Sequence, residues 1–215
     1  MIRDASLTEI LIMVPAMLMA LTIHELCHGL SAYWLGDSTA KRDGRLSLNP
    51  IKHIDPIGLL LLLFVGFGWA KPVMVNPYNL KNPKVDMALI SIAGPLSNFI
   101  MAFLGMMIFY AIFFFAPVTA FTIHAINAVR MFTFINIVLG VFNLLPIPPL
   151  DGSKVVAGLL PDSVYRSLPP VGMYGMIFLM ILMLTGVTRQ IIFPIINAVF
   201  EAFASVVLSF YSLFL

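Results

Sequence analysis

The sequence contains a single cysteine and few charged residues, and each scarcity excludes a class of protein. Cys27 has no second cysteine to pair with, so no disulfide can form within the chain. Charged residues make up 10% of the chain, whereas an average soluble domain has about a quarter. The 12 basic and 10 acidic residues leave a net charge of only +2, and the basic ones form no clustered stripe. These features exclude a nucleic-acid-binding protein.

Apolar residues are abundant and lie in long runs. They account for 60% of the 215 residues, more than a water-soluble fold can cover. A membrane-spanning helix needs about 20 mostly apolar residues. The runs that we interpret as spans cover residues 9–33, 87–115, 129–145, 171–185 and 190–215. We therefore predict an all-α polytopic membrane protein with about five transmembrane helices. Residues 1–215 are expected to form one transmembrane domain, with a core at 9–155 and C-terminal helices at 171–215.

Two shorter segments between the first two spans do not follow this pattern. Residues 57–69 form an apolar run that contains three glycines and is bounded by Asp55-Pro56 and Lys71-Pro72. Their length suits a re-entrant or interfacial segment better than a complete crossing. Residues 44–50 alternate apolar and polar side chains before a turn signal. This alternation predicts a short β-strand at residues 45–48.

The distribution of basic residues predicts the orientation in the membrane. Seven Lys and Arg residues lie between the first two predicted spans, whereas residues 116–128 contain none. Short cytoplasmic loops are enriched in such residues. We therefore expect a multi-pass protein of the cell membrane with its N-terminus outside and the first long loop in the cytoplasm. This orientation requires residues 57–69 to enter and leave the membrane on the same side.

The first predicted span ends in a motif that indicates a metal site, His24-Glu25-Leu26-Cys27-His28. Residues four apart lie one above the other on a helix, so His24 and His28 can both bind one zinc ion. Glu25, one step around the helix, can act as a general base that takes the proton of an attacking water. Cys27 points to a different face, and we do not predict it as a ligand.

A third ligand is needed, because a hydrolytic zinc usually keeps three protein ligands. Asp151 is the best candidate, since the predicted topology brings the end of the span at 129–145 to the same side as the histidines. Three prolines at positions 146, 148 and 149 should unwind the helix just before it. Unwound backbone at membrane depth is tolerated where it lines a wet cavity, which hydrolysis requires. The alternative role of Asp151 is to cap the following helix.

Three motifs resemble those of the site-2 protease family of intramembrane zinc metalloproteases. The first is the segment at residues 24–28, and the second is Ala93-Gly94-Pro95-Leu96-Ser97-Asn98, which we interpret as a helix start. The third, residues 143–152, is similar to the family's Asn-x-x-Pro and Leu-Asp-Gly signature, although Ser153 stands where many members have a second glycine. Together the three motifs extend over most of the chain up to Gly152.

The resemblance implies one zinc ion per chain, bound by His24, His28 and Asp151, with Glu25 as the general base. It also implies that Asn143 holds the substrate or the oxyanion. The alternative for this asparagine is a hydrogen bond across helices.

The sequence thus predicts an intramembrane zinc endopeptidase that cleaves transmembrane segments of other membrane proteins. Its partners are these substrates and the lipid bilayer. An extended substrate is expected to pair with residues 45–48 by strand addition. Two alternatives are a non-proteolytic zinc-binding membrane regulator and a metal or ion transporter. The absence of a visible internal repeat argues against the transporter, as does the placement of the ionisable groups at one depth.

Overall fold

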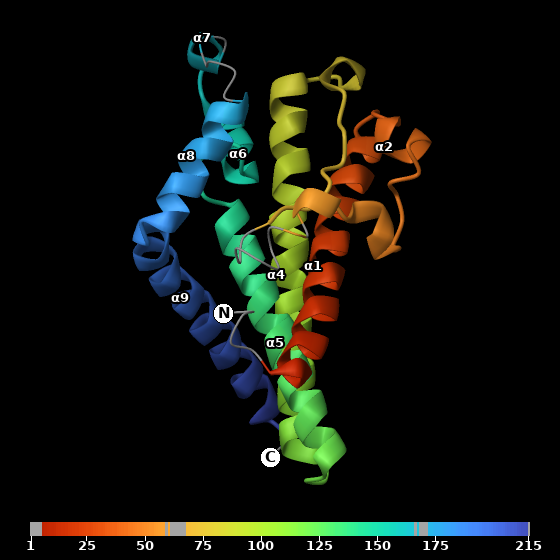
Figure 1. Cartoon of the computed structure of the whole chain (residues 1–215), viewed down its shortest axis with the longest axis vertical. Coiled ribbons are helices and arrows are strands. Elements are labelled where there is room, and N and C mark those ends of the chain that lie inside the picture. Colours follow the sequence, from red (N-terminus) through yellow and green to blue (C-terminus); the bar gives the residue numbers. More distant parts are fainter. Residues whose placement is uncertain (1–5, 59, 61–67, 166, 168–171, 215) are drawn as a thin grey trace.

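The computed structural model describes residues 6–58, 60, 68–165, 167 and 172–214 (Figure 1). Within them the regular secondary structure is entirely helical. Four segments are long and apolar enough to cross a membrane, namely α1 (Leu7–Trp34), α4 (Pro83–Phe115), α5 (Ala120–Asn143) and Gln190–Tyr211 of α9. α1 and α5 run in one direction along the bundle, and α4 and α9 run in the other (Figure 1). The predicted all-α multi-pass architecture is confirmed.

The spanning helices begin earlier than the apolar runs because polar caps and prolines start them. Ser6 caps α1 in a reciprocal pair with Glu9, and Thr119 caps α5 in the same way with Thr122. α4 begins at Pro83, where the missing N–H of a first-turn proline costs no hydrogen bond. The predicted helix start at residues 93–98 is therefore wrong, since that motif lies inside α4.

The C-terminal part of the chain, for which the sequence predicts two separate spans, contains two described helices. α8 (Gly172–Leu184) has 13 residues, about 20 Å of helix, against a hydrocarbon thickness of about 30 Å. α9 (Val187–Tyr211) follows after Gly186, whose φ of +75° turns the chain. Figure 1 shows α8 and α9 descending one after the other along the same side of the bundle. Among the described residues there are thus four candidate spans, and the count of five is not confirmed.

The predicted strand at residues 45–48 is not observed. The backbone bends there, since the Ser47 N–H donates to the Arg45 carbonyl at 2.9 Å. The alternation has another origin: Arg45 is buried and its side chain binds backbone carbonyls of neighbouring segments. The β-type pairing that the described residues do contain is one antiparallel bridge between Ile54 and Ala70.

The Ile54–Ala70 bridge joins the two flanks of the segment at residues 57–69. Lys71 N–H also donates to the His53 carbonyl at 2.9 Å, so the two flanks of this segment lie side by side. A segment with adjacent ends returns to the side from which it left, as the predicted topology requires. Residues 59 and 61–67 themselves lie outside the described residues.

The bundle is held together by apolar contacts among α4, α5 and α9. The buried cluster comprises Ala102, Ile137, Val141, Ile192 and Ile196. The Tyr211 hydroxyl donates to the Met107 carbonyl at 2.9 Å and fastens the end of α9 to α4.

α1 packs against α4 and α5 and leads into the short elements of one end of the bundle. These elements are α2 (Thr39–Arg42), η2 (Pro50–His53), η3 (Pro77–Asn79), α6 (Asp151–Leu159) and α7 (Asp162–Tyr165). Figure 1 shows α2, α6 and α7 at the same end. The chemistry-bearing residues lie toward this end.

Candidate metal centre and active site

The three predicted ligands meet where α1 and α6 approach each other. His24 and His28 lie one turn apart on α1, and Asp151 is the first residue of α6. The Nε2 atoms of the two histidines are 3.0 Å apart. Asp151 Oδ2 lies 3.2 Å from His24 Nε2 and 3.0 Å from His28 Nε2. All three residues are buried, and their ligand atoms form a compact group that could hold one metal ion.

The other ring nitrogen of each histidine is held by α4. His24 Nδ1 lies 2.7 Å from Asn98 Oδ1, and His28 Nδ1 lies 2.7 Å from the carbonyl oxygen of Ile90. The Asn98 amide group donates to Asn136 Oδ1 at 2.9 Å, which assigns its own Oδ1 as an acceptor. Both histidines therefore donate Nδ1–H to α4 and turn an unprotonated Nε2 toward the centre of the group.

The chemistry of this group fits zinc. Two bare imidazole nitrogens and a carboxylate oxygen all offer electron pairs, so their close approach is unfavourable unless a cation lies between them. Atoms that bind a tetrahedral zinc at about 2.0–2.1 Å are about 3.3 Å apart. The distances of 3.0 to 3.2 Å come close to this value. Outer hydrogen bonds like those of the two Nδ1 atoms are typical of metal-binding histidines.

Gly94 allows α4 to approach the two histidines closely. A Cβ atom at this position would lie 2.5 Å from His28 Nε2 and 2.7 Å from His24 Cε1. Such distances are shorter than real Cβ contacts, so any larger residue has to displace the imidazoles. α4 therefore packs closely at Gly94 against the candidate metal centre.

Asp151 is presented by a stretch of chain that the prolines keep out of helical conformation. α5 ends at Asn143, residues 144–150 are not helical, and α6 begins at Asp151. The N-cap position of α6 belongs to Leu150, so the alternative capping role of Asp151 has no support. Its outer oxygen, Oδ1, lies 3.4 Å from Lys154 Nζ, and its inner oxygen faces the histidines. Oδ2 of Asp151 thus faces the two histidines, and Oδ1 faces Lys154.

The carboxylate of Glu25 is oriented by a backbone amide. Glu25 is half-buried on α1, and its Oε2 accepts the Val73 N–H at 2.8 Å. Val73 belongs to residues 71–79, a segment that we call the strap. Its residues 71–76 have no regular secondary structure, and η3 forms its end.

A buried arginine anchors the beginning of the strap. The Arg45 guanidinium, only 7% exposed, donates to the carbonyls of Lys71 and Pro72 and to that of Lys52. A planar guanidinium can bind several carbonyls at once, which suits it to fixing a loop. It thereby holds the residues directly before Val73.

A buried aspartate anchors the other end of the strap. The Asp37 carboxylate accepts the Asn76 N–H and the Asn79 side-chain amide, both at 2.7 Å, and the Thr39 hydroxyl at 2.6 Å. Burial raises the pKa of the Asp37 carboxyl, but the hydrogen bonds from Thr39, Asn79 and Asn76 outweigh that effect and hold its pKa below the usual value. Asp37 is therefore ionised near neutral pH.

The metal-binding group opens into a cavity of about 340 Å³. Glu25, Asn143 and Lys154 line it together with residues 72–75 of the strap. The Asn143 side chain donates to the Leu139 carbonyl of its own helix at 3.0 Å. No hydrogen bond across helices is found for Asn143 in the described part of the chain, so its alternative role is not supported.

Two contributors to this site received no role from the sequence. Asn98 stands in the motif at residues 93–98, four residues after Gly94. That spacing places Gly94 and Asn98 on one helix face, so the motif could have indicated that Asn98 faces the histidines together with Gly94. Val73 acts through its backbone N–H, for which no side-chain pattern exists. His53 is buried in η2, and Cys27 lies outside the metal-binding group.

Comparison with known proteins shows the family to which the chain belongs. The model of peptidase family M50 matches residues 12–187. A Bacillus subtilis protein named as a zinc metalloprotease, YwhC, is 40% identical over 188 residues, which is 86% of each chain. Proteins named as zinc metalloprotease Rip2 from Mycolicibacterium smegmatis and Mycobacterium tuberculosis H37Rv are each 29% identical. They match over 93% and 86% of this chain and 77% and 71% of their own lengths. No solved structure matches significantly.

Proposed function

The chain belongs to peptidase family M50, the site-2 protease family, and we propose that it is an intramembrane zinc endopeptidase that cleaves transmembrane segments of membrane-protein substrates. One observation carries the proposal. Three electron-pair donors from His24, His28 and Asp151 converge within 3.2 Å beside the carboxylate of Glu25. Zinc is the metal that suits this donor set, and the relatives carry zinc in their names.

Each residue of the site has a distinct part in hydrolysis. His24, His28 and Asp151 hold the zinc, which when bound supplies a Lewis acid for the scissile carbonyl and for the attacking water. Glu25 takes the proton of this water and passes it to the leaving amine. The Val73 amide keeps the Glu25 carboxylate turned into the cavity. Asn143, on the cavity wall, holds the substrate or the oxyanion.

The substrate has to be unwound, because a peptide bond within a helix is shielded from a nucleophile. The proposed place for an extended substrate is the strap rather than residues 45–48, which are bent and carry the anchor Arg45. Met74 and Val75 line the cavity, and their backbone groups have no hydrogen-bond partner among the described residues. Such an edge can take up a substrate by strand addition.

The proposed orientation places the N-terminus outside the cell membrane and the active site toward the cytoplasm. The short elements and the strap lie at one end of the bundle. The chain between the first two spans forms much of this end and is rich in Lys and Arg, as cytoplasmic loops are. The adjacent flanks of residues 57–69 support this orientation.

Zinc content and cleavage test the proposal together. The purified protein, reconstituted in liposomes with a transmembrane reporter, should bind about one zinc and cleave the reporter within the membrane. Glu25→Gln should keep the zinc and lose cleavage by about 10³-fold or more, because the general base is gone. His24→Ala and Asp151→Ala should lose both.

Three results would contradict the proposal. Asp151→Ala with full zinc content would remove it from the ligand set. Glu25→Gln with full biological activity would favour a non-proteolytic regulator. Metal flux into liposomes without cleavage would favour a transporter.

A further inference from the structure

α9 carries a row of polar side chains on the face that points away from the bundle. This polar row consists of exposed residues at every fourth position, namely Asn197, Glu201, Ser205 and Ser209. Residues four apart lie on the same side of a helix. The opposite side is apolar and packs into the bundle through Ile192, Ile196 and Val207. The side chains of the polar row make no hydrogen bond or ion pair within the described part of the chain.

Glu201 lies at the middle of a candidate membrane span. The span covers Gln190–Tyr211, so Glu201 follows its first residue by eleven positions and precedes its last by ten. These offsets correspond to about 15 Å of helix on either side. The hydrocarbon layer of a bilayer is about 30 Å thick, so Glu201 lies near its centre.

α9 follows α4 lengthwise and thus crosses the same layer. The Phe203 ring lies 5.5 Å from that of Phe103, and the Tyr211 ring lies 6.0 Å from that of Phe115, the last residue of α4. A helix that runs along a spanning helix does not lie flat on the membrane surface. The polar row of a single copy therefore faces hydrocarbon, where a polar group without a partner is unfavourable. Another polar surface within the membrane has to cover it.

A second copy of the chain supplies a polar surface that matches this row. Two copies inserted with the same topology bring their α9 helices together in parallel, so residues of equal depth meet. Asn197 offers amide donors, and Glu201, one helical turn further on, offers carboxyl acceptors. Across a twofold axis, each Asn197 can donate to the Glu201 of the other copy. The exposed Ala198 and Ala202 beside them are small, which lets the two backbones approach closely.

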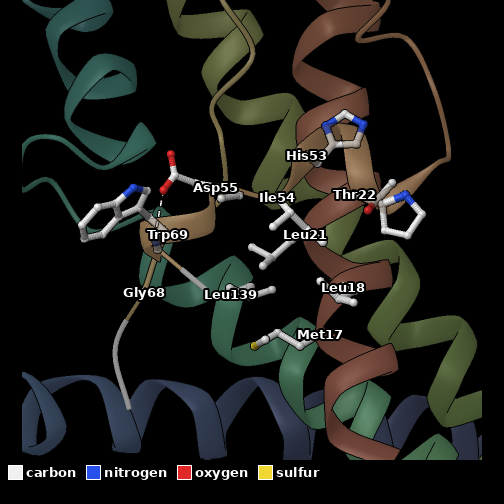
Figure 2. A pocket seen from close by; sticks show the side chains of 13 residues that line it. Met17, Leu18, Leu21, Thr22, His53, Ile54, Asp55, Gly68, Trp69 and Leu139 are labelled. Carbon is white, nitrogen blue, oxygen red and sulfur yellow. Dashed lines mark hydrogen bonds between the residues drawn. The ribbon is translucent and has the colours of Figure 1, made fainter. Parts of the chain in front are cut away.

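We propose that α9 is the interface of a parallel homodimer in the membrane, held by hydrogen bonds between Asn197 of each copy and Glu201 of the other. Lipid tails offer no such donors or acceptors. The interface leaves the catalytic end free: among the described residues that line the metal-binding cavity, and the smaller cavity beside η2 in Figure 2, none belongs to α9. Pairing through α9 is therefore independent of the proposed peptidase function.

Glu201→Leu tests the hydrogen bonds between the copies. In a parent protein with Cys27→Ala and Lys41→Cys, donor and acceptor dyes on the new cysteine report association in liposomes by energy transfer at several protein-to-lipid ratios. The parent should dimerise. Glu201→Leu should raise the dissociation constant about 10-fold or more, because an interhelical hydrogen bond is lost twice. Glu201→Gln keeps an acceptor and should stay within about 3-fold of the parent.

Two controls separate pairing from folding. Zinc content should be the same in the parent and in all these variants, because α9 holds none of the proposed ligands. Ile100→Ala changes an exposed side chain near the middle of α4 and should associate like the parent.

Cysteine cross-linking tests the geometry of the interface. In a Cys27→Ala background, Ala198→Cys should form a covalent dimer when membranes are oxidised. Ile100→Cys, on the exposed side of α4, should stay monomeric. Equal cross-linking at both positions would show random collision and would contradict the interface.

Two further results would overturn the homodimer. One is a parent protein that stays monomeric at every density, and the other is a Glu201→Leu variant that associates as tightly as the parent. If the parent pairs with the transmembrane helix of a reporter and not with itself, the polar row is a docking face for substrates and the homodimer is wrong. None of these measurements uses cleavage, so a failure of the proposed peptidase function would leave them unaffected.

Discussion

Asn98 connects the metal centre to the interior of the helix bundle. It is fully buried on α4, accepts the His24 Nδ1–H, and donates to Ala20 on α1 and to Asn136 on α5. One side chain thus links three helices and sets the tautomer of His24. A second-sphere residue of this kind acts on the metal through the ligand that it orients.

Asn98→Ala should weaken zinc binding by about 10- to 100-fold, because the buried Nδ1–H of His24 loses its acceptor. Competition with a chelating dye measures the affinity. Asn136→Ala, one hydrogen bond further from the metal, serves as the control and should have a smaller effect. Equal zinc affinity in Asn98→Ala and the wild type would show that the hydrogen bond does not orient the ligand.

Gly94→Ala should abolish zinc binding and cleavage, because the added Cβ would lie within 2.5 Å of the His28 ring. Metal analysis of the purified variant measures the zinc content. Gly105→Ala is the matched control on the same helix, where a Cβ would lie 2.5 Å from Thr133 Oγ1, away from the ligands. It should lower the thermal stability and keep one zinc. Normal zinc content in Gly94→Ala would contradict the close approach of α4.

The strap orients the proposed general base, Glu25, beside the candidate metal centre. It is anchored by Arg45 at its beginning and by Asp37 at its end, both buried and both charged. Between these anchors, the strap donates a backbone hydrogen bond to Glu25 and lines the cavity. Its geometry therefore bears on both catalysis and substrate binding.

Proline substitutions separate these two roles of the strap. Val73→Pro removes the amide that binds Glu25, and kcat should fall about 10-fold or more with little change in KM, because a hydrogen bond to a charged group is lost. Met74→Pro removes a backbone donor that has no partner among the described residues, so KM should rise while kcat changes little. Steady-state kinetics on a transmembrane reporter measures both. Identical effects of the two variants would mean that either proline merely displaces the strap.

The anchor at Asp37 also gives a dependence on pH. The lowered pKa of Asp37 means that its stabilising contribution is complete above the pKa of the unfolded chain, about 3.9, and is lost as the pH falls through the lower folded value. Asp37→Asn should therefore lower the thermal stability at pH 7 and reduce its loss on acidification below pH 4. Thermal unfolding at several pH values measures this. A parallel acid response in both proteins would exclude Asp37 as its source.

As a whole, the molecule is a bundle whose catalytic end carries the short elements and whose other end carries the α4–α5 turn (Figure 1). The proposed metal ligands lie on α1 and α6, and α4 binds the outer ring nitrogens of the two histidines. Proper assembly of the site thus requires α1, α4 and α5 to cross the membrane in alternating directions.

Single cysteines can test the orientation of the bundle. In a Cys27→Ala background, Thr119→Cys in the α4–α5 turn should react with a membrane-impermeant maleimide in intact cells. Lys41→Cys, at an exposed position of α2, should react only after permeabilisation. The opposite labelling pattern would show that the orientation is reversed. Labelling of both sites in intact cells would contradict an odd number of membrane crossings between residues 41 and 119.

Much of this architecture follows from local features of the sequence. The spacing of His24 and His28 places both on one helix face, the prolines before Asp151 end α5, and the apolar runs define most of the spans. These features act over a turn or a few residues, so they can be recognised without knowledge of the fold. The period-two pattern at residues 45–48 gave no strand, because the backbone bends there and the polar residue Arg45 is buried. The run at 171–185 contains a described helix of 13 residues, so the fifth span is not confirmed.

The contacts that orient the site depend on packing between distant segments. His24 and Asn98 are 74 residues apart, and Glu25 and Val73 are 48 apart. Neither pair has a spacing rule, because each distance depends on how the helices cross and where the strap is anchored. The ligand types could therefore be predicted from residue identity, whereas the tautomers of the histidines and the orientation of the general base emerged only from the folded chain.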